Sequence, residues 1–500
     1  MNKRSAMLAV SDFDLSLGLT VILTAVVTVL IGYVLSKNFS TRLPPGPWGL
    51  PYLGYWPWLS HDWHLDFTKI GEKYGDIFTV YLFNNPLVIL NGTKSMQEAF
   101  YKNPNAWAGR PYSHGFDLFE LNPENLFKDD FTVKFKARRK FGMANLKKFG
   151  YGLPGFQENI EGLIDSTAAA FNSHKGMPFF FRDELWIYGA QALPSVLFGR
   201  RYKPNDKGFN QVLDDTEIWF AELRPVCEAD VIPILRFFPR KCVAKSVPAV
   251  RRMLKWFTAS IEERRAEFDP DNPCCFVDIC ILNKQDNDEI LNFIMSFWGD
   301  GTDTIVGTIR WWIYFMAHYP EFQAKAQHEI EDAIGGRRPL QSDKKDLQFL
   351  EATFMETIRI TTPVPTSLLL KTKEDVEILG YMIPKDTAYF ANWDNMHKDP
   401  EVFENPDDFN PERFMLKDGT CDSKNKGWAG FAIGKRSCMG EPLARQVIFL
   451  FLANLLQQFT FSFPENEVPS KNFADLAMPG EGVVNMPVDF KIIATPRATS

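Results

Sequence analysis

The longest uninterrupted apolar stretch lies near the start of this 500-residue chain. Residues Leu15 to Leu35 include no charged side chain, and Lys37 and Arg42 follow soon after. In a helix that rises about 1.5 Å per residue, this stretch can cross the roughly 30 Å hydrocarbon core of a bilayer. A secretory signal peptide has a shorter apolar region, of about 7–15 residues, and a small-residue cleavage site. The pattern therefore predicts a single membrane-spanning anchor over residues 1–36.

Prolines dominate the segment that follows the predicted anchor. It reads Pro44-Pro-Gly-Pro-Trp-Gly-Leu-Pro51. Proline fixes φ and cannot continue a helix, so residues 37–54 are predicted to form a stiff, extended hinge. No second linker, repeat or low-complexity stretch follows. Residues 55–500 are therefore expected to form one large domain.

Helical periodicity dominates the body of the chain, whereas strand patterns are short and few. Residues 288–318 predict a long helix, and residues 340–360 contain another. Two strands are expected on either side of residues 84–86, with further short strands at 376–383 and 459–463. The predicted fold class is mainly α with small β-sheets (α+β), preceded by the membrane helix.

Composition and charge narrow the class of protein. Apolar residues make up 45% and charged residues 23% of the chain, which predicts a large buried core and not a disordered protein. The net charge of -7 argues against nucleic acid as the main partner. Seven cysteines without a C-x-x-C pair argue against a disulfide scaffold and against a structural zinc site. This cysteine usage favours a cytosolic location for the body.

One cysteine lies in a context that suits a metal-bound thiolate. Within the segment from Phe431 to Gly440, Gly434 and Gly440 bracket Cys438, and each glycine allows positive φ or the close approach of a flat ligand. A helix with an early proline is expected directly after it. The dipole of that helix and the charge of Arg436 favour the thiolate form. A lone Cys-x-Gly would indicate a buried structural cysteine, but the full string Phe-x-x-Gly-x-Arg-x-Cys-x-Gly is far more specific.

This string resembles the haem-binding loop of the cytochrome P450 superfamily. The layout of the chain is similar to that of animal microsomal members, family-2-like ones in particular. The resemblance implies the cytochrome P450 fold, haem b (iron protoporphyrin IX) as cofactor, and Cys438 as the axial ligand of the haem iron. It also implies that Phe431 packs near the sulfur, that Arg436 meets a haem propionate, and that Gly434 and Gly440 contribute to the haem site.

Further motifs follow the pattern of the same family in the same order. Glu356 and Arg359 form its Glu-x-x-Arg, in which positions i and i+3 share one helix face and can pair. A Pro-Glu-Arg-Phe segment places Arg413 where the resemblance implies the third member of a buried structural network. Phe135 and Arg139 align with a Trp-x-x-x-Arg motif, so Arg139 is expected to reach the second propionate.

The predicted long helix carries Gly-Asp-Gly-Thr-Asp-Thr at residues 299–304. This segment resembles the oxygen-activating segment of the family. Gly301 is expected to loosen the helix and make room for dioxygen. The resemblance implies that Thr304 donates a hydrogen bond to bound dioxygen and that Asp303 relays protons. The alternative is an ordinary helix with solvent-facing Asp and Thr, although the apolar neighbours of this pair favour burial.

The chain departs from the family pattern at two positions near the expected haem. Asp300 stands where the family usually has Ala or Gly, and two hypotheses follow: it binds a polar or cationic group of the substrate, or it disturbs oxygen chemistry. Leu370 replaces a His that contacts a propionate in family-2-like proteins, with Lys371 as a candidate substitute. Candidate residues of the substrate pocket, chosen mostly by position, are Phe116, Phe119, Phe220, Phe297, Asp300, Val364 and Val483.

The resemblance implies a monooxygenase that inserts one atom of O2 into a small lipophilic substrate. Electrons come from NADPH through a flavoprotein cytochrome reductase, with cytochrome b5 as a second candidate donor. The implied location is the endoplasmic reticulum membrane, with a single span and a cytosolic catalytic domain. Two alternatives stay open: a haem-thiolate isomerase or dehydratase, and a non-catalytic haem-binding protein. A face expected to receive the reductase includes Lys134, Lys136, Arg138, Lys140, Lys424, Lys426 and Lys435.

Overall fold

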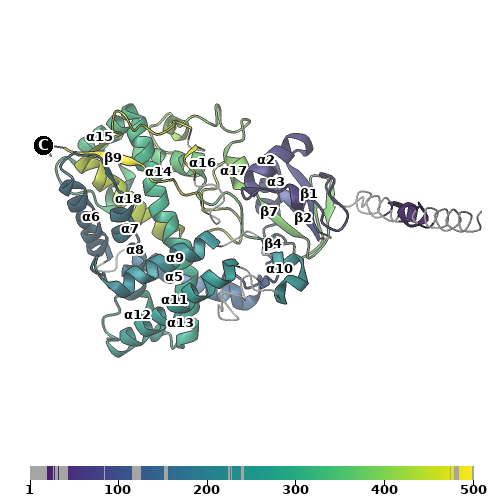
Figure 1. Cartoon of the computed structure of the whole chain (residues 1–500). Coiled ribbons are helices and arrows are strands. Elements are labelled where there is room, and N and C mark those ends of the chain that lie inside the picture. The colour runs from purple at the N-terminus through teal and green to yellow at the C-terminus, as the bar shows by residue number, and fades with distance from the viewer. Residues whose placement is uncertain are drawn as a thin grey trace, which may run out of the picture.

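The computed structural model covers the body of the chain almost completely (Figure 1). The described residues are 43–83, 85–114, 126–150, 156–222, 226, 228–237, 241–472, 475–477 and 484–497, with positions 18, 20–25, 27–28 and 32 near the start. Most of the predicted membrane span lies outside them. Within these described residues, no helix is both long enough and apolar enough to cross a membrane.

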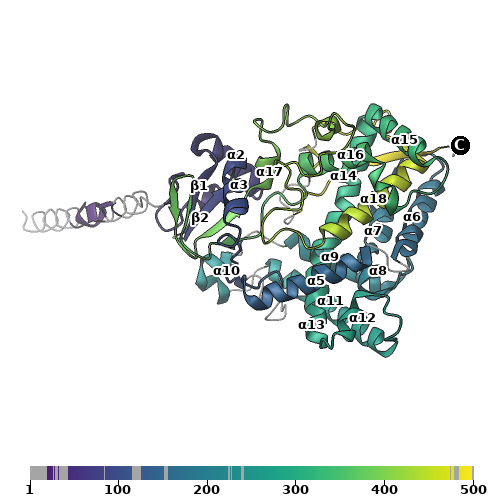
Figure 2. The ribbon, with the colours of Figure 1, turned by 180° about the vertical axis from the view of Figure 1, so that it is seen from behind.

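Three helices that are buried along most of their length form the centre of the helical part. They are α14 (Asp303–His318), α16 (Gln348–Thr361) and α18 (Glu441–Gln458). Polar side chains buried in such a helix need hydrogen-bond partners from neighbouring elements. Figures 1 and 2 show these three helices next to one another in the middle of the helical part. A hydrogen bond of 2.9 Å from Trp312 Nε1 to Thr353 Oγ1 joins α14 to α16 inside this core.

Most of the surrounding helices have one buried and one more exposed face, whereas every residue of α8 (Ala192–Phe198) is buried. The longer ones are α2 (Trp63–Tyr74), α5 (Val133–Gly150), α6 (Phe156–Ser173), α7 (Arg182–Gly189), α9 (Lys207–Glu222), α11 (Lys241–Ala266), α13 (Asn287–Gly301) and α15 (Pro320–Ile334). The shorter ones are α3 (Thr93–Gln97), α8 (Ala192–Phe198), α10 (Glu228–Val231), α12 (Phe276–Leu282) and α17 (Trp393–His397), with single turns at Trp56–Trp58, Glu98–Lys102, Pro233–Phe237, Gln341–Lys345 and Pro411–Phe414.

The sheets are small, and the largest lies on the side of the molecule opposite the C-terminal end (Figure 1). Its strand order is β1-β2-β7-β4, with β2 antiparallel to β1 and parallel to β7. The described part of the predicted hinge packs along it, because the Thr79 N–H donates to the Pro45 carbonyl at 3.1 Å. The strands are β1 (Ile77–Leu82), β2 (Asn85–Leu90), β3 (Phe179–Phe180), β4 (Leu370–Lys371), β5 (Val376–Ile378), β6 (Tyr381–Ile383), β7 (Ala388–Ala391), β8 (Phe459–Ser462) and β9 (Lys491–Pro496).

Two predicted elements are interrupted for identifiable physical reasons. The expected helix over 288–318 is two helices, since α13 ends at Gly301 and α14 begins at Asp303. The break falls at Thr302 (φ -94°, ψ -66°), next to the glycine that was expected to loosen the helix. The expected strand over 376–383 is a hairpin of β5 and β6. Leu379 and Gly380 both have positive φ, which suits the tight turn of a two-residue hairpin loop.

A buried ion network fixes α16 to the loop that precedes the cysteine segment. Arg359 Nε and Nη2 donate to the two oxygens of Glu356 at 2.7 and 2.9 Å. Arg413 Nε donates to the same carboxylate at 3.0 Å, and so does the Asn410 N–H at 2.8 Å. The side chains of Glu356 and Arg359 are completely buried. The structure thus brings together the three residues expected to form the network.

Replacing Glu356 by Gln is expected to destabilise the fold strongly. Removing one partner of a buried ion pair leaves the other charge uncompensated, which costs about 3–5 kcal/mol of unfolding free energy. Denaturant unfolding of both proteins measures this difference. Glu401→Gln is the matched control, because Glu401 pairs with Lys94 at 2.9 Å while both side chains are mostly exposed. Equal losses in the two variants would contradict the assignment.

Candidate functional site

The segment before α18 folds back on itself so that Cys438 lies beside Phe431. The Cys438 N–H donates to the Phe431 carbonyl at 2.8 Å. Two residues between them have positive φ, Ala432 at 57° and Gly434 at 88°. At Gly434 an added Cβ would also lie 3.0 Å from the Phe100 ring, so glycine is required twice over. The helix expected after this loop does begin at Glu441, with a proline in its first turn.

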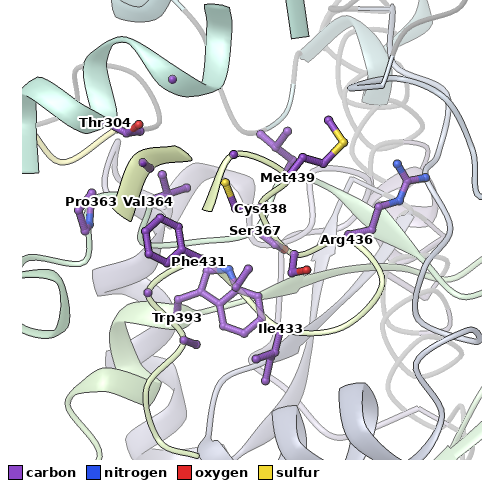
Figure 3. Close-up of a pocket in the computed structure, with 18 of the residues that line it drawn as sticks. Thr304, Pro363, Val364, Ser367, Trp393, Phe431, Ile433, Arg436, Cys438 and Met439 are labelled. Atoms are coloured by element: carbon purple, nitrogen blue, oxygen red, sulfur yellow. The ribbon is translucent and has the colours of Figure 1, made fainter. Parts of the chain in front are cut away.

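A cavity lies between this loop and α14. Cys438, Phe431 and Met439 line it from the loop, and Thr304 lines it from the helix. Figure 3 shows the Cys438 sulfur directed toward the space that separates the loop from Thr304. Gly440 adds no side chain there, and a Cβ at that position would lie 3.8 Å from the sulfur. The arrangement leaves one side of a sulfur ligand open to a bound group.

Three arginines line the same cavity, and the most informative is Arg436. Its Nε donates to the Ala108 carbonyl at 2.9 Å and its Nη2 to the Asp129 carbonyl at 2.6 Å. The guanidinium carbon lies 3.9 Å from the centre of the Phe135 ring. Nη1 is buried and has no hydrogen-bond partner among the described residues. Burial, reinforced by Arg110, lowers the pKa of Arg436 to about 9.

A buried cation with an unused donor is costly unless an anion reaches it. The donor set at the cavity therefore fits a flat ligand that carries acidic groups and an atom bound by sulfur, as haem does with its propionates and iron. Arg139 belongs to the same group, because its Nη2 donates to the carbonyl of Ser437. The third arginine, Arg110, was not predicted. It donates through Nη1 to the Leu369 carbonyl at 2.7 Å, and a single arginine in a loop gives no periodic signal in the sequence.

Leu370 lines the cavity, as expected of a residue that replaces a propionate contact. Lys371, the suggested substitute, is not among the described residues that line the cavity, and its Nζ pairs with Asp386 at 2.8 Å. Lys371 follows Leu370 in strand β4, which pairs with β7, and successive side chains of a strand point to opposite faces of the sheet. Arg110 is therefore the better placed cation on this side.

The predicted acid–alcohol pair is divided between two environments. Thr304 lines the cavity, whereas Asp303 is not among the described residues that do. Asp303 is 6% exposed, and its charged neighbours are Glu217 on α9 and Arg182 on α7. Burial, and secondarily Glu217, raises the pKa of the Asp303 carboxyl to about 8. Asp303 is therefore mostly protonated at neutral pH.

The other candidate pocket residues fall into three groups. Phe297 and Val364 line the cavity. Phe220 is not in the described lining and packs against Trp219 at 5.1 Å between ring centres. The backbone of Asp300 lies in α13, but its side chain is outside the described part, as are Phe116, Phe119 and Val483. Lining residues that sequence reasoning missed include Leu126, Phe127, Leu193, Thr362, Thr366 and Leu368.

Comparison with known proteins assigns the family. The cytochrome P450 family model matches residues 44–492. The chain belongs to the cytochrome P450 family. It is 30% identical over 475 residues to cytochrome P450 1A1 of Chelon saliens, covering 88% of this chain and 90% of the relative. It is 28% identical over 480 residues to cytochrome P450 1A1 of Rattus norvegicus, covering 90% and 91%. It is 29% identical over 450 residues to cytochrome P450 1A5 of Gallus gallus, covering 85% of each.

As a cytochrome P450, the protein is a haem-thiolate monooxygenase and an oxidoreductase that binds haem b. The predicted superfamily and fold are confirmed, whereas a specific likeness to family-2 members stays a prediction, since these relatives carry the designation 1A. The prediction that Arg138 belongs to the basic face is wrong, because its side chain is buried. Arg138 is 9% exposed and its guanidinium is used by Glu289 at 2.5 Å and by Asp129 at 3.2 Å.

Arg436→Met is expected to lower haem retention, because the variant removes a buried donor that has no protein partner among the described residues. The measurement is the haem-to-protein ratio after gel filtration and the rate of haem loss to a scavenger. The matched control is Lys140→Met, which removes a positive charge from an exposed side chain outside the described cavity lining. Equal haem loss from both variants would show that net charge, and not the buried donor, holds the group.

Proposed function

We propose that Cys438 is the axial thiolate ligand of haem in this monooxygenase. The observation that carries the proposal is the position of its sulfur, which faces the cavity on the side of Thr304 while three arginines line the same space. Bound haem supplies the iron at which dioxygen is activated. Phe431 covers the loop side of the sulfur, where its ring lies 5.9 Å from that of Trp428. Gly434, Gly440 and Gly301 leave room for a flat ligand where side chains would intrude.

The propionates are assigned to the arginines of the cavity. Arg436 offers its unused Nη1 to one propionate, and Arg139 lies on the same side near Ser437. Arg110 is the additional cation that fits where Leu370 offers none. Because guanidinium groups bind carboxylates through two parallel donors, these side chains orient the ligand as well as neutralising it.

Thr304 and Asp303 are assigned to proton handling. The Thr304 hydroxyl lies at the cavity and can donate a hydrogen bond to a group held there. The buried carboxyl of Asp303 holds a proton at neutral pH, and its charged neighbours are Glu217 and Arg182. A carboxyl with pKa near the working pH can both release and regain a proton. The two residues thus supply a donor at the cavity and a proton reserve behind it.

A small lipophilic substrate suits the part of the cavity that is lined by apolar side chains. The side chains there are largely apolar: Phe127, Leu193, Phe297, Ile305 and Val364. Apolar lining with few polar groups favours burial of a lipophilic molecule and restricts water. We also propose that Asp300 contacts a polar or cationic group of the substrate.

Electrons are proposed to come from NADPH through a flavoprotein reductase, with cytochrome b5 as a second donor. Six lysines of the expected face are exposed: Lys134, Lys136, Lys140, Lys424, Lys426 and Lys435. Exposed cations attract an acidic partner and raise its association rate. We also assign residues 1–36 to the membrane anchor, 37–54 to the hinge and 55–500 to the catalytic domain. We further propose that the catalytic domain lies on the cytosolic side of the endoplasmic reticulum membrane.

Cys438→Ser is expected to abolish thiolate ligation. The reduced carbon monoxide adduct of the natural protein should show the red-shifted Soret band of a thiolate-bound haem, and the variant should lack it. Cys421→Ser is the matched control, because this half-buried thiol lies outside the described cavity lining. A red-shifted band that survives in the Cys438 variant would remove the basis of the proposed ligation.

Thr304→Ala is expected to uncouple electron use from product formation. Without the hydroxyl at the cavity, NADPH consumption should continue while product falls about 10-fold or more and hydrogen peroxide rises. Thr308→Ala is the control, since the Thr308 hydroxyl already donates to the Thr304 carbonyl at 2.7 Å. Coupling is measured as product formed per NADPH consumed. Unchanged coupling in the Thr304 variant would exclude this role.

A further inference from the structure

Two adjacent cysteines form a polar cluster where α11 is followed by α12, outside the described lining of the haem cavity. Cys274 and Cys275 come directly before α12, and Asp278 lies in its first turn. The two sulfurs and a carboxylate oxygen of Asp278 all lie within 4.8 Å of one another. None of these side chains has a part in the proposed haem chemistry.

Arg264 on α11 holds this cluster together. Its Nε and Nη2 donate to the two carboxylate oxygens of Asp278 at 2.7 and 2.8 Å. The same Nη2 donates to Cys274 Sγ at 3.3 Å. The Cys274 N–H also donates to Asp278 Oδ2, at 2.9 Å. The sulfur of Cys274 is therefore held at a fixed place beside a guanidinium group.

Gly199 packs closely against the sulfur of Cys274. A Cβ added at Gly199 would lie 3.2 Å from Cys274 Sγ and 3.2 Å from Cys275 Cβ. Gly199 has φ of 67°, in the left-handed region that favours glycine. The sulfur thus rests against backbone on one side, while Cys274 as a whole remains exposed to solvent.

The groups around this sulfur favour its ionised form. A hydrogen bond from the Cys275 thiol and the charge of Arg264 together lower the pKa of Cys274 to about 7, although partial burial and Asp278 oppose the shift. The other charged groups on the packed elements are Arg200, Glu263 and Glu267. Arg200 pairs with both carboxylates and Glu267 also lies 3.7 Å from Arg264, so these three groups leave one negative charge beside the cluster. Burial raises the pKa of the Cys275 thiol far above its usual range, so Cys275 stays a thiol.

Cys274 differs in this from the other described cysteines. Cys275 and Cys280 are buried, and Cys421 and Cys438 are partly buried. Burial raises the pKa values of Cys280 and Cys421, the latter to about 12. Within the part of the chain that the structure describes, only Cys274 combines an exposed side chain, a sulfur held by a hydrogen bond from arginine and a lowered thiol pKa.

A metal ion is a poorer occupant of this cluster. Both oxygens of Asp278 are already used by Arg264 and by a backbone N–H. The guanidinium would also repel a cation placed between the sulfurs. A neutral or anionic reagent that attacks a single sulfur meets neither obstacle.

We propose that Cys274 is a modification site that reacts with small disulfides. The Cys274 thiolate attacks one sulfur of the disulfide, so a new sulfur–sulfur bond forms to Cys274 while the original one breaks. The departing thiolate takes up a proton from solvent. Cys274 is oxidised to the mixed disulfide and half of the reagent is reduced to the thiol, so no further oxidant is needed. Arg264 is the positioning residue, because its Nη2 donates to Cys274 Sγ and holds the sulfur in place before the reaction.

Reaction with oxidised glutathione as a function of pH tests the proposal on the full-length holoenzyme. The adduct on each cysteine is followed by peptide mass spectrometry, first in the folded protein and then in the same protein unfolded in urea. An ordinary thiol of pKa about 8.5 loses roughly 200-fold in thiolate between pH 9 and pH 6, whereas a thiol of pKa about 7 loses about 10-fold. The folded protein should show the smaller fall at Cys274 and the unfolded protein the larger one.

Two variants assign the effect to Arg264. Arg264→Gln should move the pH midpoint of the reaction at Cys274 toward that of the unfolded chain. Arg265→Gln is the matched control, since Arg265 donates to Asn287 at 2.9 Å and should leave the midpoint unchanged. Equal midpoints in the folded and unfolded natural protein would overturn the proposal. So would faster modification of another cysteine, or a disulfide between Cys274 and Cys275 in place of the adduct.

Discussion

The buried ion pair of Glu356 and Arg359 is the interaction on which the haem site depends. Arg359 also donates through Nη1 to the His397 carbonyl at 2.8 Å. His397 Nε2 accepts the Ala429 N–H at 2.9 Å, and Nδ1 therefore carries the hydrogen that reaches Thr362 Oγ1 at 2.9 Å. Burial lowers the pKa of His397 to about 3, so its ring stays neutral and keeps this acceptor. A continuous chain of bonds thus runs from α16 to the start of the cysteine loop.

The same support explains why the loop can hold unfavourable backbone. The Ala432 N–H donates to the Ala429 carbonyl at 2.8 Å, and Ala432 itself has positive φ, which costs free energy for any residue with a Cβ. Trp428 adds a second tie, because its Nε1 donates to the Met355 carbonyl on α16 at 2.9 Å. Such strain persists only where the surroundings over-determine the conformation. Here α16 supplies that constraint, and the sulfur is held where a ligand can meet it.

Sequence reasoning captured the parts of this architecture that depend on local pattern. The helical and strand character of residues 288–318 and 376–383 and the helix after Cys438 follow from periodicity and proline, whereas the breaks at Thr302 and at Leu379-Gly380 were not predicted. The network of Glu356 follows from the family resemblance. It missed Arg110 and misplaced Arg138, because whether an arginine is buried depends on which elements pack over it. Phe220 was misplaced for the same reason, since its ring packs against Trp219 and is not in the described cavity lining. Tertiary packing decides these cases, and no local pattern records it.

The helical geometry of α14 accounts for the division of the acid–alcohol pair. Consecutive residues of an α-helix point about 100° apart, so Thr304 can line the cavity only if Asp303 turns elsewhere. The direction that remains leads toward α7 and α9, where Arg182 pairs with Glu217 and so offers Asp303 little net positive charge. Asp303 therefore stays protonated instead of forming an ion pair. A neutral acid in the first turn of α14 and a hydroxyl at the cavity are thus two consequences of how this one helix packs.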